Sequence, residues 1–282
     1  IFNALTRGRQ PIEAAVGRME VHTAVVDVPD GRVDSLSALF KPQKTIYAKV
    51  TYLDIAGLGS TADKGEISGQ LLNQLSQVDG LIHVVRCFEN SSVVHIHGSV
   101  DPQRDIRLMD EELLLNDQIM VERKMEKLDE EKRRFMGRDK EVVEREAALF
   151  SQLRAALNAS TPLRNLDLSD EEEKMMQGFG FLSRKPILIL LNLGEGQEAP
   201  EVVYPHLHSK VLALQGRLEM DLAQLPDEDR GIFMEEYGIK ELGLSRLIRE
   251  SYDLLGLQSF FTVGEDEVRA WTVKRGSLAP QA

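Results

Sequence analysis

The sequence predicts an α/β fold whose sheet is interrupted by a long helical hairpin. Three observations carry this prediction. Residues 45–90 are typical of a strand, a glycine-containing loop, an amphipathic helix and a second apolar strand, in that order. Apolar residues recur every seven positions through residues 114–157, which indicates two long packed helices. The apolar run Pro186–Leu191 indicates a further strand, buried in the sheet.

Composition indicates a globular protein of a reducing compartment. A chain of 282 residues has the length of about two domains, and 42% hydrophobic with 28% charged residues is typical of a protein with a sizeable core. No apolar run approaches the ~20 residues of a membrane span, and no signal-peptide pattern opens the chain. The single cysteine, Cys87, cannot form an internal disulfide. We therefore expect a cytoplasmic protein that does not contact membranes.

The strand Ile46–Ile55 delivers Asp54 at its C-terminal end, and Gly57 follows at once. A carboxylate there can hold Mg²⁺, usually through water, and the N–H of Gly57 can contact the γ-phosphate of a nucleoside triphosphate. Alone, this pattern is also typical of an ordinary turn. The amphipathic helix after it and the apolar strand Gly80–Cys87 favour the nucleotide site.

Extended to DIAGL, KGE and HVVRCFEN, the stretch resembles the Obg-like ATPase family, also called the YchF family of P-loop GTPases. The resemblance covers nearly the whole chain. It implies a P-loop NTPase sheet, Mg²⁺-dependent hydrolysis of ATP or GTP, and the ribosome as partner. In that family the phosphate-binding loop directly precedes IFNAL, and this loop is absent from the sequence. The chain as written should therefore bind nucleotide poorly.

The resemblance also exposes two departures in the switch regions. The first switch would fall in Arg7–Glu20, and Arg18 stands where the family often has a Mg²⁺-coordinating threonine; Thr23 is the nearest hydroxyl downstream. Leu58 stands where many GTPases have a water-orienting glutamine, although the Obg-like family also has a hydrophobic residue there. Because leucine cannot orient water, another group must position the nucleophile.

His95 is the candidate for that group, since the family has a histidine at the matching place. A neutral imidazole could orient water or accept its proton. A solvent-exposed loop histidine is the equally weighted alternative. The spacing of His95 and His97 would also suit a metal, but the pair lacks carboxylate neighbours in the sequence. His83 lies inside a strand and is better explained as a core residue.

The heptad pattern predicts two helical arms joined at Gly137, forming an antiparallel coiled-coil hairpin inserted into the nucleotide domain, as in the family. Basic residues crowd the predicted tip and could contact RNA phosphates or an acidic partner. Acidic residues beside them favour an ordinary solvated surface. The heptad positions are Leu114, Val121, Leu128, Phe135, Val143, Phe150 and Leu157, and the basic residues are Lys132, Arg133, Arg134, Arg138 and Lys140.

The base-binding residues are predicted after Pro186–Leu191. Many GTPases have Asn-Lys-x-Asp there, whereas this chain has Asn192, Leu193 and Glu195. The Asn-x-x-Glu form resembles that of the Obg-like family, which tends to favour ATP over GTP, and Leu193 could offer an apolar surface to the base. The family's second base-contacting loop would match Ala213 and Leu214, with Phe88 as a further neighbour of the base.

The segment after residue 215 is expected to form three helices, Gly216–Leu225, Glu228–Tyr237 and Gly243–Leu255. Leu257–Thr272 then resembles the opening of the family's TGS domain, a small β-grasp module linked to RNA and ribosome contacts. Its Phe260, Phe261 and Trp271 could stack on bases, or could form the core of a small sheet.

The sequence thus predicts four segments. The nucleotide domain occupies residues 1–104 and 181–255, the helical insertion 105–180, and the start of the β-grasp domain 256–282. The predicted function is Mg²⁺-dependent binding and hydrolysis of ATP or GTP by a cytoplasmic, ribosome-associated protein, with slow unaided hydrolysis. The alternatives are a scaffold that binds nucleotide or RNA without hydrolysis, acting through the hairpin and the β-grasp module, and an RNA-binding adaptor whose RNA affinity depends steeply on salt.

Overall fold

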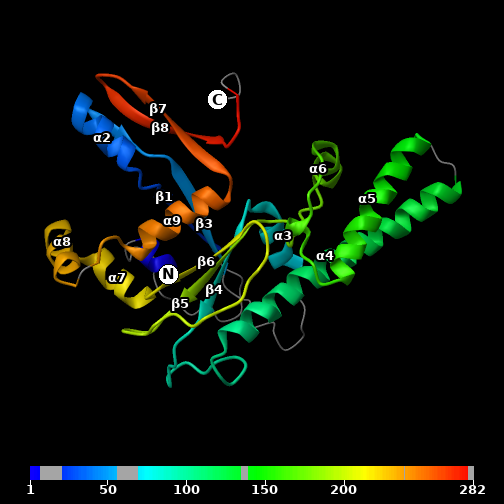
Figure 1. Cartoon of the computed structure of the whole chain (residues 1–282), viewed down its shortest axis with the longest axis horizontal. Helices are drawn as coiled ribbons and strands as arrows, with labels where there is room; N and C mark the ends of the chain where they lie inside the picture. The colour runs from blue at the N-terminus through cyan, green and yellow to red at the C-terminus, as the bar shows by residue number, and fades with distance from the viewer. Residues whose placement is uncertain (7–20, 56–68, 135–138, 238, 279–282) are drawn as a thin grey trace.

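The computed structural model describes residues 1–6, 21–55, 69–134, 139–237 and 239–278 (Figure 1). Positions that carried predictions and lie outside these ranges include Arg18, Gly57, Leu58, Phe135, Gly137 and Arg138. In the described part, no helix has the length and apolar character needed to cross a membrane.

A parallel sheet forms the centre of the molecule. It contains β4 (Leu81–Arg86), β5 (Ile187–Asn192) and β6 (Ser209–Leu214), in the order β4–β5–β6. Residues 187–191 of β5, the central strand, are buried on both faces of the sheet. The apolar runs of the sequence therefore predicted β4 and β5 correctly, to within one residue of each end.

The two faces of β5 point into two different cores. Ile187, Ile189 and Leu191 pack with residues of α3 (Gly69–Gln77) and α4 (Pro102–Arg134). Their neighbours in sequence, Leu188 and Leu190, pack on the opposite face. The elements on that face are α1 (Phe2–Leu5), α7 (Gly216–Gln224) and α9 (Gly243–Leu254). Helices thus cover both faces, as expected for a parallel sheet.

Strands β1 (Val21–Asp27) and β3 (Lys49–Ile55) pair antiparallel and form a separate two-stranded sheet. The single strand predicted over Ile46–Ile55 is wrong in one respect, because it is divided in two. Its first part belongs to β2 (Lys44–Ile46), which pairs in parallel with β8 (Glu267–Lys274). The strands of the described residues thus form three sheets.

The C-terminal hairpin is not packed as a separate body. It consists of β7 (Leu257–Val263) and β8, and with β2 it forms a three-stranded sheet. Val268 and Ala270 of β8 share one core with Val33 of α2 (Gly31–Phe40), Val50 of β3 and Tyr252 of α9. The C-terminal pair is therefore held by residues from the first fifth of the chain. The domain boundary at residue 256 stays a prediction.

Helices α4 and α5 (Lys140–Asn158) run antiparallel and project to the right of the sheet, on the side away from α7 (Figure 1). Gln118 Nε2 donates to Asn158 Oδ1 at 2.8 Å, and Lys124 pairs with Glu146 at 2.6 Å. The described heptad residues lie in the core between the helices or pack against it. They are Leu114, Val121, Leu128, Val143, Phe150 and Leu157.

The chain returns from α5 to the sheet through the short helix η2 (Leu163–Asn165) and α6 (Asp170–Met176). Helix α6 begins with a capping box, in which the Ser169 side chain accepts from the Glu172 N–H and the Glu172 carboxylate accepts from the Ser169 N–H. The last helix before α9 is α8 (Asp227–Glu236).

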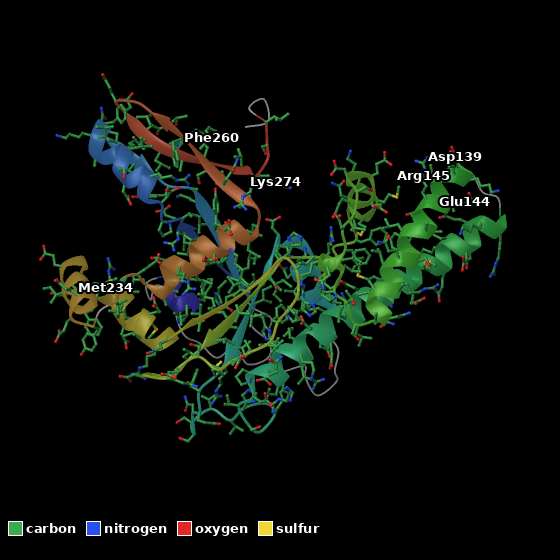
Figure 2. All side chains as sticks on the ribbon, in the orientation of Figure 1. Asp139, Glu144, Arg145, Met234, Phe260 and Lys274 are labelled. Atoms are coloured by element: carbon green, nitrogen blue, oxygen red, sulfur yellow. The ribbon has the colours of Figure 1, made fainter. Side chains whose placement is uncertain are left out.

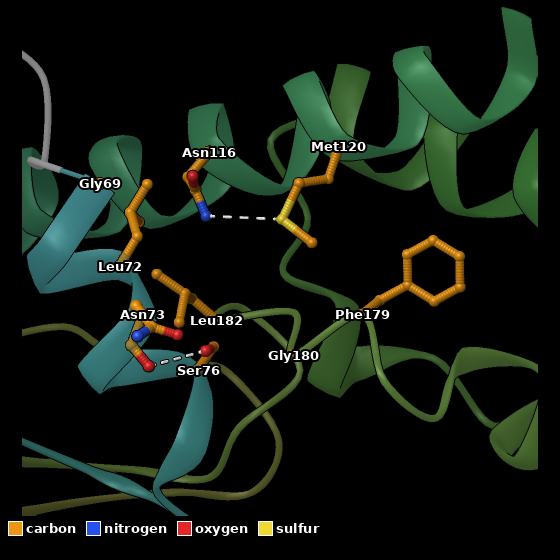
Figure 3. Close-up of a pocket in the computed structure, with 9 residues that line it drawn as sticks. All are labelled: Gly69, Leu72, Asn73, Ser76, Asn116, Met120, Phe179, Gly180 and Leu182. Carbon is orange, nitrogen blue, oxygen red and sulfur yellow. Dashed lines mark hydrogen bonds between the residues drawn. The ribbon is translucent and has the colours of Figure 1, made fainter.

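A small pocket of about 250 Å³ lies between α3 and the base of α4 (Figure 3). Asn73 and Ser76 of α3 line one side, and Asn116 and Met120 of α4 line the other. Gly180 closes one end, and a Cβ atom there would lie 2.7 Å from Ser76 Cβ, so only glycine fits this close approach. Gly180 therefore allows the segment before β5 to lie directly against α3.

Candidate functional site

The predicted base-binding segments meet at the C-terminal ends of the parallel strands. The Cys87 N–H, after β4, donates to the Asn192 carbonyl at 2.9 Å, and the Leu193 N–H donates to the Leu214 carbonyl at the same distance. Parallel α/β sheets bind ligands outside the carboxyl ends of their strands. The structure therefore brings Phe88, Asn192–Glu195 and Ala213–Leu214 to one such edge.

Asn192 connects this edge to helix α7. Its Oδ1 accepts from the Gly216 N–H at 3.1 Å, at the first residue of the helix. A Cβ atom on Gly216 would lie 2.6 Å from the same oxygen and 2.9 Å from the Ile1 side chain. A side chain at position 216 would therefore displace the Asn192 amide from the Gly216 N–H. The amide nitrogen of Asn192 takes no part in this contact.

The loop after Asn192 is shaped by Gln197, a residue that the sequence analysis missed. Gln197 Oε1 accepts from the Gly194 N–H at 2.9 Å, and its Nε2 donates to the Cys87 carbonyl at 2.5 Å. One side chain therefore fixes the loop against the end of β4. Glu195 lies at the exposed turn of this loop. No sequence signal marks a glutamine in this role, because its partners are backbone atoms.

Leu193 differs from the expectation that its side chain faces the base. It is 8% exposed and packs in the core beneath the sheet edge, with Val85, Cys87 and Leu191. Leu214 is also buried, on the opposite face, whereas Ala213 is partly exposed. In this conformation these residues offer mainly backbone atoms to a ligand, because their alternating side chains continue the pattern of the strands.

Arg86 positions Phe88, and it was also missed. Its Nε donates to the Phe88 carbonyl at 2.9 Å, and Nη1 donates to the Val93 carbonyl at 2.8 Å. Its guanidinium carbon lies 5.1 Å from the centre of the Phe88 ring, within the range of a cation–π contact. Arg86 thus fixes the loop that leads from β4 to His95.

Asp54 lies at the C-terminal end of β3, opposite His22 of β1, and is exposed. The Phe2 and His22 rings lie 6.3 Å apart, and His22 is the ladder partner of Asp54. The ends of β3 and α1 are therefore close neighbours. No group of three or more His, Cys, Asp or Glu suited to a metal occurs in the described residues. One exposed carboxylate nevertheless fits Mg²⁺, which takes most of its ligands from water and phosphate.

His95 is not the solvent-exposed loop residue that was considered as an alternative. Its side chain is only 9% exposed, and Nε2 lies 3.0 Å from Asp105 Oδ2 near the start of α4. The His97 N–H donates to His95 Nδ1 at 3.2 Å.

His83 was predicted to be a core residue. Burial lowers the pKa of its imidazole to about 4, while the charge of Asp105 raises it. Neutral imidazole is therefore the form of His83 near pH 7.

Comparison with known proteins shows the family to which the chain belongs. The whole chain aligns with the ribosome-binding ATPase YchF of Escherichia coli O157:H7, at 38% identity and covering 79% of that protein. This chain belongs to the YchF family. The YchF protein of Bacillus subtilis strain 168 is 34% identical over the same share of each chain. Residues 257–282 match the YchF-GTPase_C family, described as a protein of unknown function (DUF933).

The fold agrees with this membership of the YchF family. The solved structure of the Schizosaccharomyces pombe YchF GTPase superposes on 99% of this chain and 78% of that one, with a TM-score of 0.81 and 28% identity. The predicted resemblance and the α/β fold class are thereby confirmed. The individual site residues stay predictions, since the comparisons do not address them.

Proposed function

We propose that this chain carries the nucleotide site of a ribosome-associated NTPase, which hydrolyses ATP or GTP with Mg²⁺. Its relatives in Escherichia coli O157:H7 and Bacillus subtilis are named ribosome-binding ATPases, and the yeast relative is named a GTPase. The geometric observation that carries the proposal is the convergence of β4, β5 and β6 at one edge, joined by the contacts of Cys87, Asn192 and Leu193. Such a protein would act in the cytoplasm.

In this proposal the base lies at the sheet edge. Asn192 presents its amide and Glu195 its carboxylate, while Leu193, Ala213 and Leu214 contribute mainly backbone atoms. Phe88, held by Arg86, borders the same edge. The longer carboxylate of glutamate cannot reproduce the two-point contact that aspartate makes with guanine, which favours ATP.

The phosphates would lie toward Asp54. Its carboxylate would hold Mg²⁺ through water, and the Gly57 N–H would contact the γ-phosphate. The metal, when bound, would neutralise phosphate charge. His95 would position the attacking water, because Leu58 cannot. Catalysis of this kind is mainly positioning and charge stabilisation, so unaided hydrolysis should be slow.

The predicted domain organisation belongs to the same proposal. Residues 1–104 and 181–255 would form the P-loop NTPase domain, and residues 105–180 a coiled-coil insertion. Residues 256–282 would begin the β-grasp domain. The antiparallel pairing of α4 and α5 supports the second assignment.

The proposal is tested by calorimetry on the protein expressed from its complete gene, with Mg·ATP and Mg·GTP. We expect binding with ATP preferred, and weaker binding in Asn192→Ala. Asn158→Ala is the matched control, since Asn158 lies on α5 and contacts Gln118. Thermal unfolding of both variants shows whether the lost contact to Gly216 has perturbed the fold. If neither nucleotide binds, the enzyme hypothesis fails.

A second candidate function, RNA binding, is favoured by the outer face of the C-terminal hairpin. Trp271 is 41% exposed and stacks on Phe260, with the ring centres 6.4 Å apart. The Arg269 guanidinium lies 4.9 Å from the Trp271 ring. An aromatic pair beside a cation is the chemistry that binds single-stranded RNA. Phe261 is not part of this face, because it packs against the core beneath the hairpin.

The measurement for this candidate is the RNA affinity of the wild type and of Trp271→Ala at several salt concentrations. Weaker binding in the variant and a steep salt dependence would support an RNA-binding role. Equal affinities would exclude this face as the contact.

A further inference from the structure

Both nitrogen atoms of the His95 ring are engaged inside the protein. Nδ1 accepts from the His97 N–H at 3.2 Å, so Nδ1 carries no proton in this state. The proton of the neutral ring is therefore on Nε2, which lies 3.0 Å from Asp105 Oδ2 and donates to it. In this arrangement His95 has no lone pair free to accept a proton from water.

Asp105 is itself held firmly. Arg104 donates to Asp105 Oδ1 from Nε at 3.0 Å and from Nη2 at 2.8 Å. The same guanidinium donates to the Ser99 carbonyl at 2.7 Å. The carboxylate thus belongs to a network that ties the loop after His95 to the first turn of α4. Asp105 accordingly offers His95 a fixed partner.

The residues on either side of His95 in the sequence face solvent. Val94 is 84% exposed and Ile96 is 56% exposed, whereas the His95 side chain is 9% exposed. Apolar side chains are normally the ones that a loop buries. Here two apolar residues face solvent and the polar residue between them is docked. The specific bond to Asp105, rather than hydrophobic burial, therefore explains the inward position of the ring.

We propose that Asp105 is a latch that holds His95 in a docked state without hydrolytic activity, and that hydrolysis requires the turn at residues 95–98 to open. Opening breaks the contact between His97 N–H and Nδ1 and frees that nitrogen for water. Asp105 is thus a positioning residue that limits the rate, not one that touches the nucleotide. This inference rests on the proposed role of His95 in hydrolysis.

The test is steady-state ATP hydrolysis by the protein expressed from its complete gene. In Asp105→Ala the latch is lost, and we expect kcat to rise by roughly tenfold with KM for ATP unchanged, since a hydrogen bond to a charged group contributes about 1.5 kcal/mol or more. Asp105→Asn retains an acceptor for Nε2–H but loses the charge, so its kcat should lie between those of the wild type and Asp105→Ala. Asp30→Ala, which removes a carboxylate paired with Arg32 on α2, is the matched control.

Two further measurements separate the latch from the proposed function. Nitrogen-15 NMR of the His95 ring should show the proton on Nε2 in the wild type and a mixture of tautomers in Asp105→Ala. His95→Ala should reduce kcat. If His95→Ala hydrolyses ATP as fast as the wild type, the proposed role of His95 fails. If it is slow but Asp105→Ala is also slower than, or equal to, the wild type, the latch is wrong and His95 keeps its role.

Discussion

The two ends of the α4–α5 hairpin are built by opposite means. At the root, charged side chains are buried: Asp117 is 0% exposed and Arg164 is 1% exposed. At the tip, the exposed side chains of Glu144 and Arg145 (Figure 2) form ion pairs with Lys140 and Glu141 of the same helix. The same residue types thus serve to fix position at one end and to keep a surface solvated at the other.

The root forms a network around the segment that enters β5. Asp117 accepts from the Leu182 N–H at 2.9 Å and from the Ser183 N–H at 2.7 Å. Arg164 donates to Tyr204 Oη at 2.6 Å and to Asp110 Oδ1 at 3.3 Å. These bonds join α4, η2 and the loop between β5 and β6. A buried charge that loses its partner is costly, so the root should be sensitive to change.

Lys185 extends this network to α3. Its Nζ donates to the Ser76 carbonyl at 3.0 Å and to the Val78 carbonyl at 2.5 Å, at the C-terminal end of that helix. A cation there is favoured by the helix dipole and satisfies free carbonyl groups. The hairpin is therefore held by buried hydrogen bonds where it meets the sheet. The described residues at its tip have few tertiary contacts.

The largest expected effect comes from Arg164→Met. The substitution keeps most of the side-chain volume but leaves the partly buried Asp110 and Tyr204 without the guanidinium. Removing one partner of a buried pair should lower the free energy of unfolding by about 3–5 kcal/mol. Denaturant unfolding measures this loss of unfolding free energy for Arg164→Met and for the matched control at the tip, Arg145→Met. Similar losses in the two variants would refute the contrast between root and tip.

An intermediate effect is expected from the titration of Asp117. Burial raises its pKa to about 6, although hydrogen bonds from Ser183 and Leu182 lower it. Because the pKa is higher in the folded state than in the unfolded state, the folded protein binds the proton more tightly. The contribution of Asp117 to stability should therefore increase as pH falls from 7 to 5, by about 1 kcal/mol.

This dependence is isolated by comparing the wild type with Asp117→Asn at both pH values. The difference in unfolding free energy between the two proteins should shift in favour of the wild type at pH 5. A difference that is the same at both pH values would mean that the carboxyl group does not titrate in this range.

The smallest effect is expected at the tip. Glu141→Ala removes the carboxylate that pairs with Arg145 at 2.5 Å, but both side chains are well exposed. Exposed pairs of this kind contribute little, because water and salt screen them. The unfolding midpoint should stay unchanged within experimental error. A clear loss of stability would show that the tip is constrained more than its exposure indicates.

Much of this fold could be predicted because its signals are periodic. The burial of Val121, Leu128, Val143 and Phe150 follows from the seven-residue spacing alone. The run Pro186–Leu191 likewise identified the central strand, since only a strand covered on both faces is apolar throughout. The order of the site segments along the chain was also sufficient to predict that they meet at one edge.

The rest depends on tertiary contacts that leave no local pattern. Gln197 and Arg86 shape the site through backbone carbonyl groups, which any sequence offers. The partner of His95 could not be read from the chain, because aspartate at position 105 also suits the first turn of a helix. Leu193 was expected to face the base because the motif was considered without the core below it.

The pairing of β2 with β8 has a consequence for how the protein folds during its synthesis on the ribosome. The side chains of Gln43 and Asp266, beside these strands, are in contact although 223 positions separate them. At about 5–20 residues per second, the second strand emerges roughly 11–45 s after the first. Val33 and Val50, which share a core with Val268, must wait through that interval with apolar surface uncovered. The nascent chain should therefore depend on chaperone protection until β8 is made.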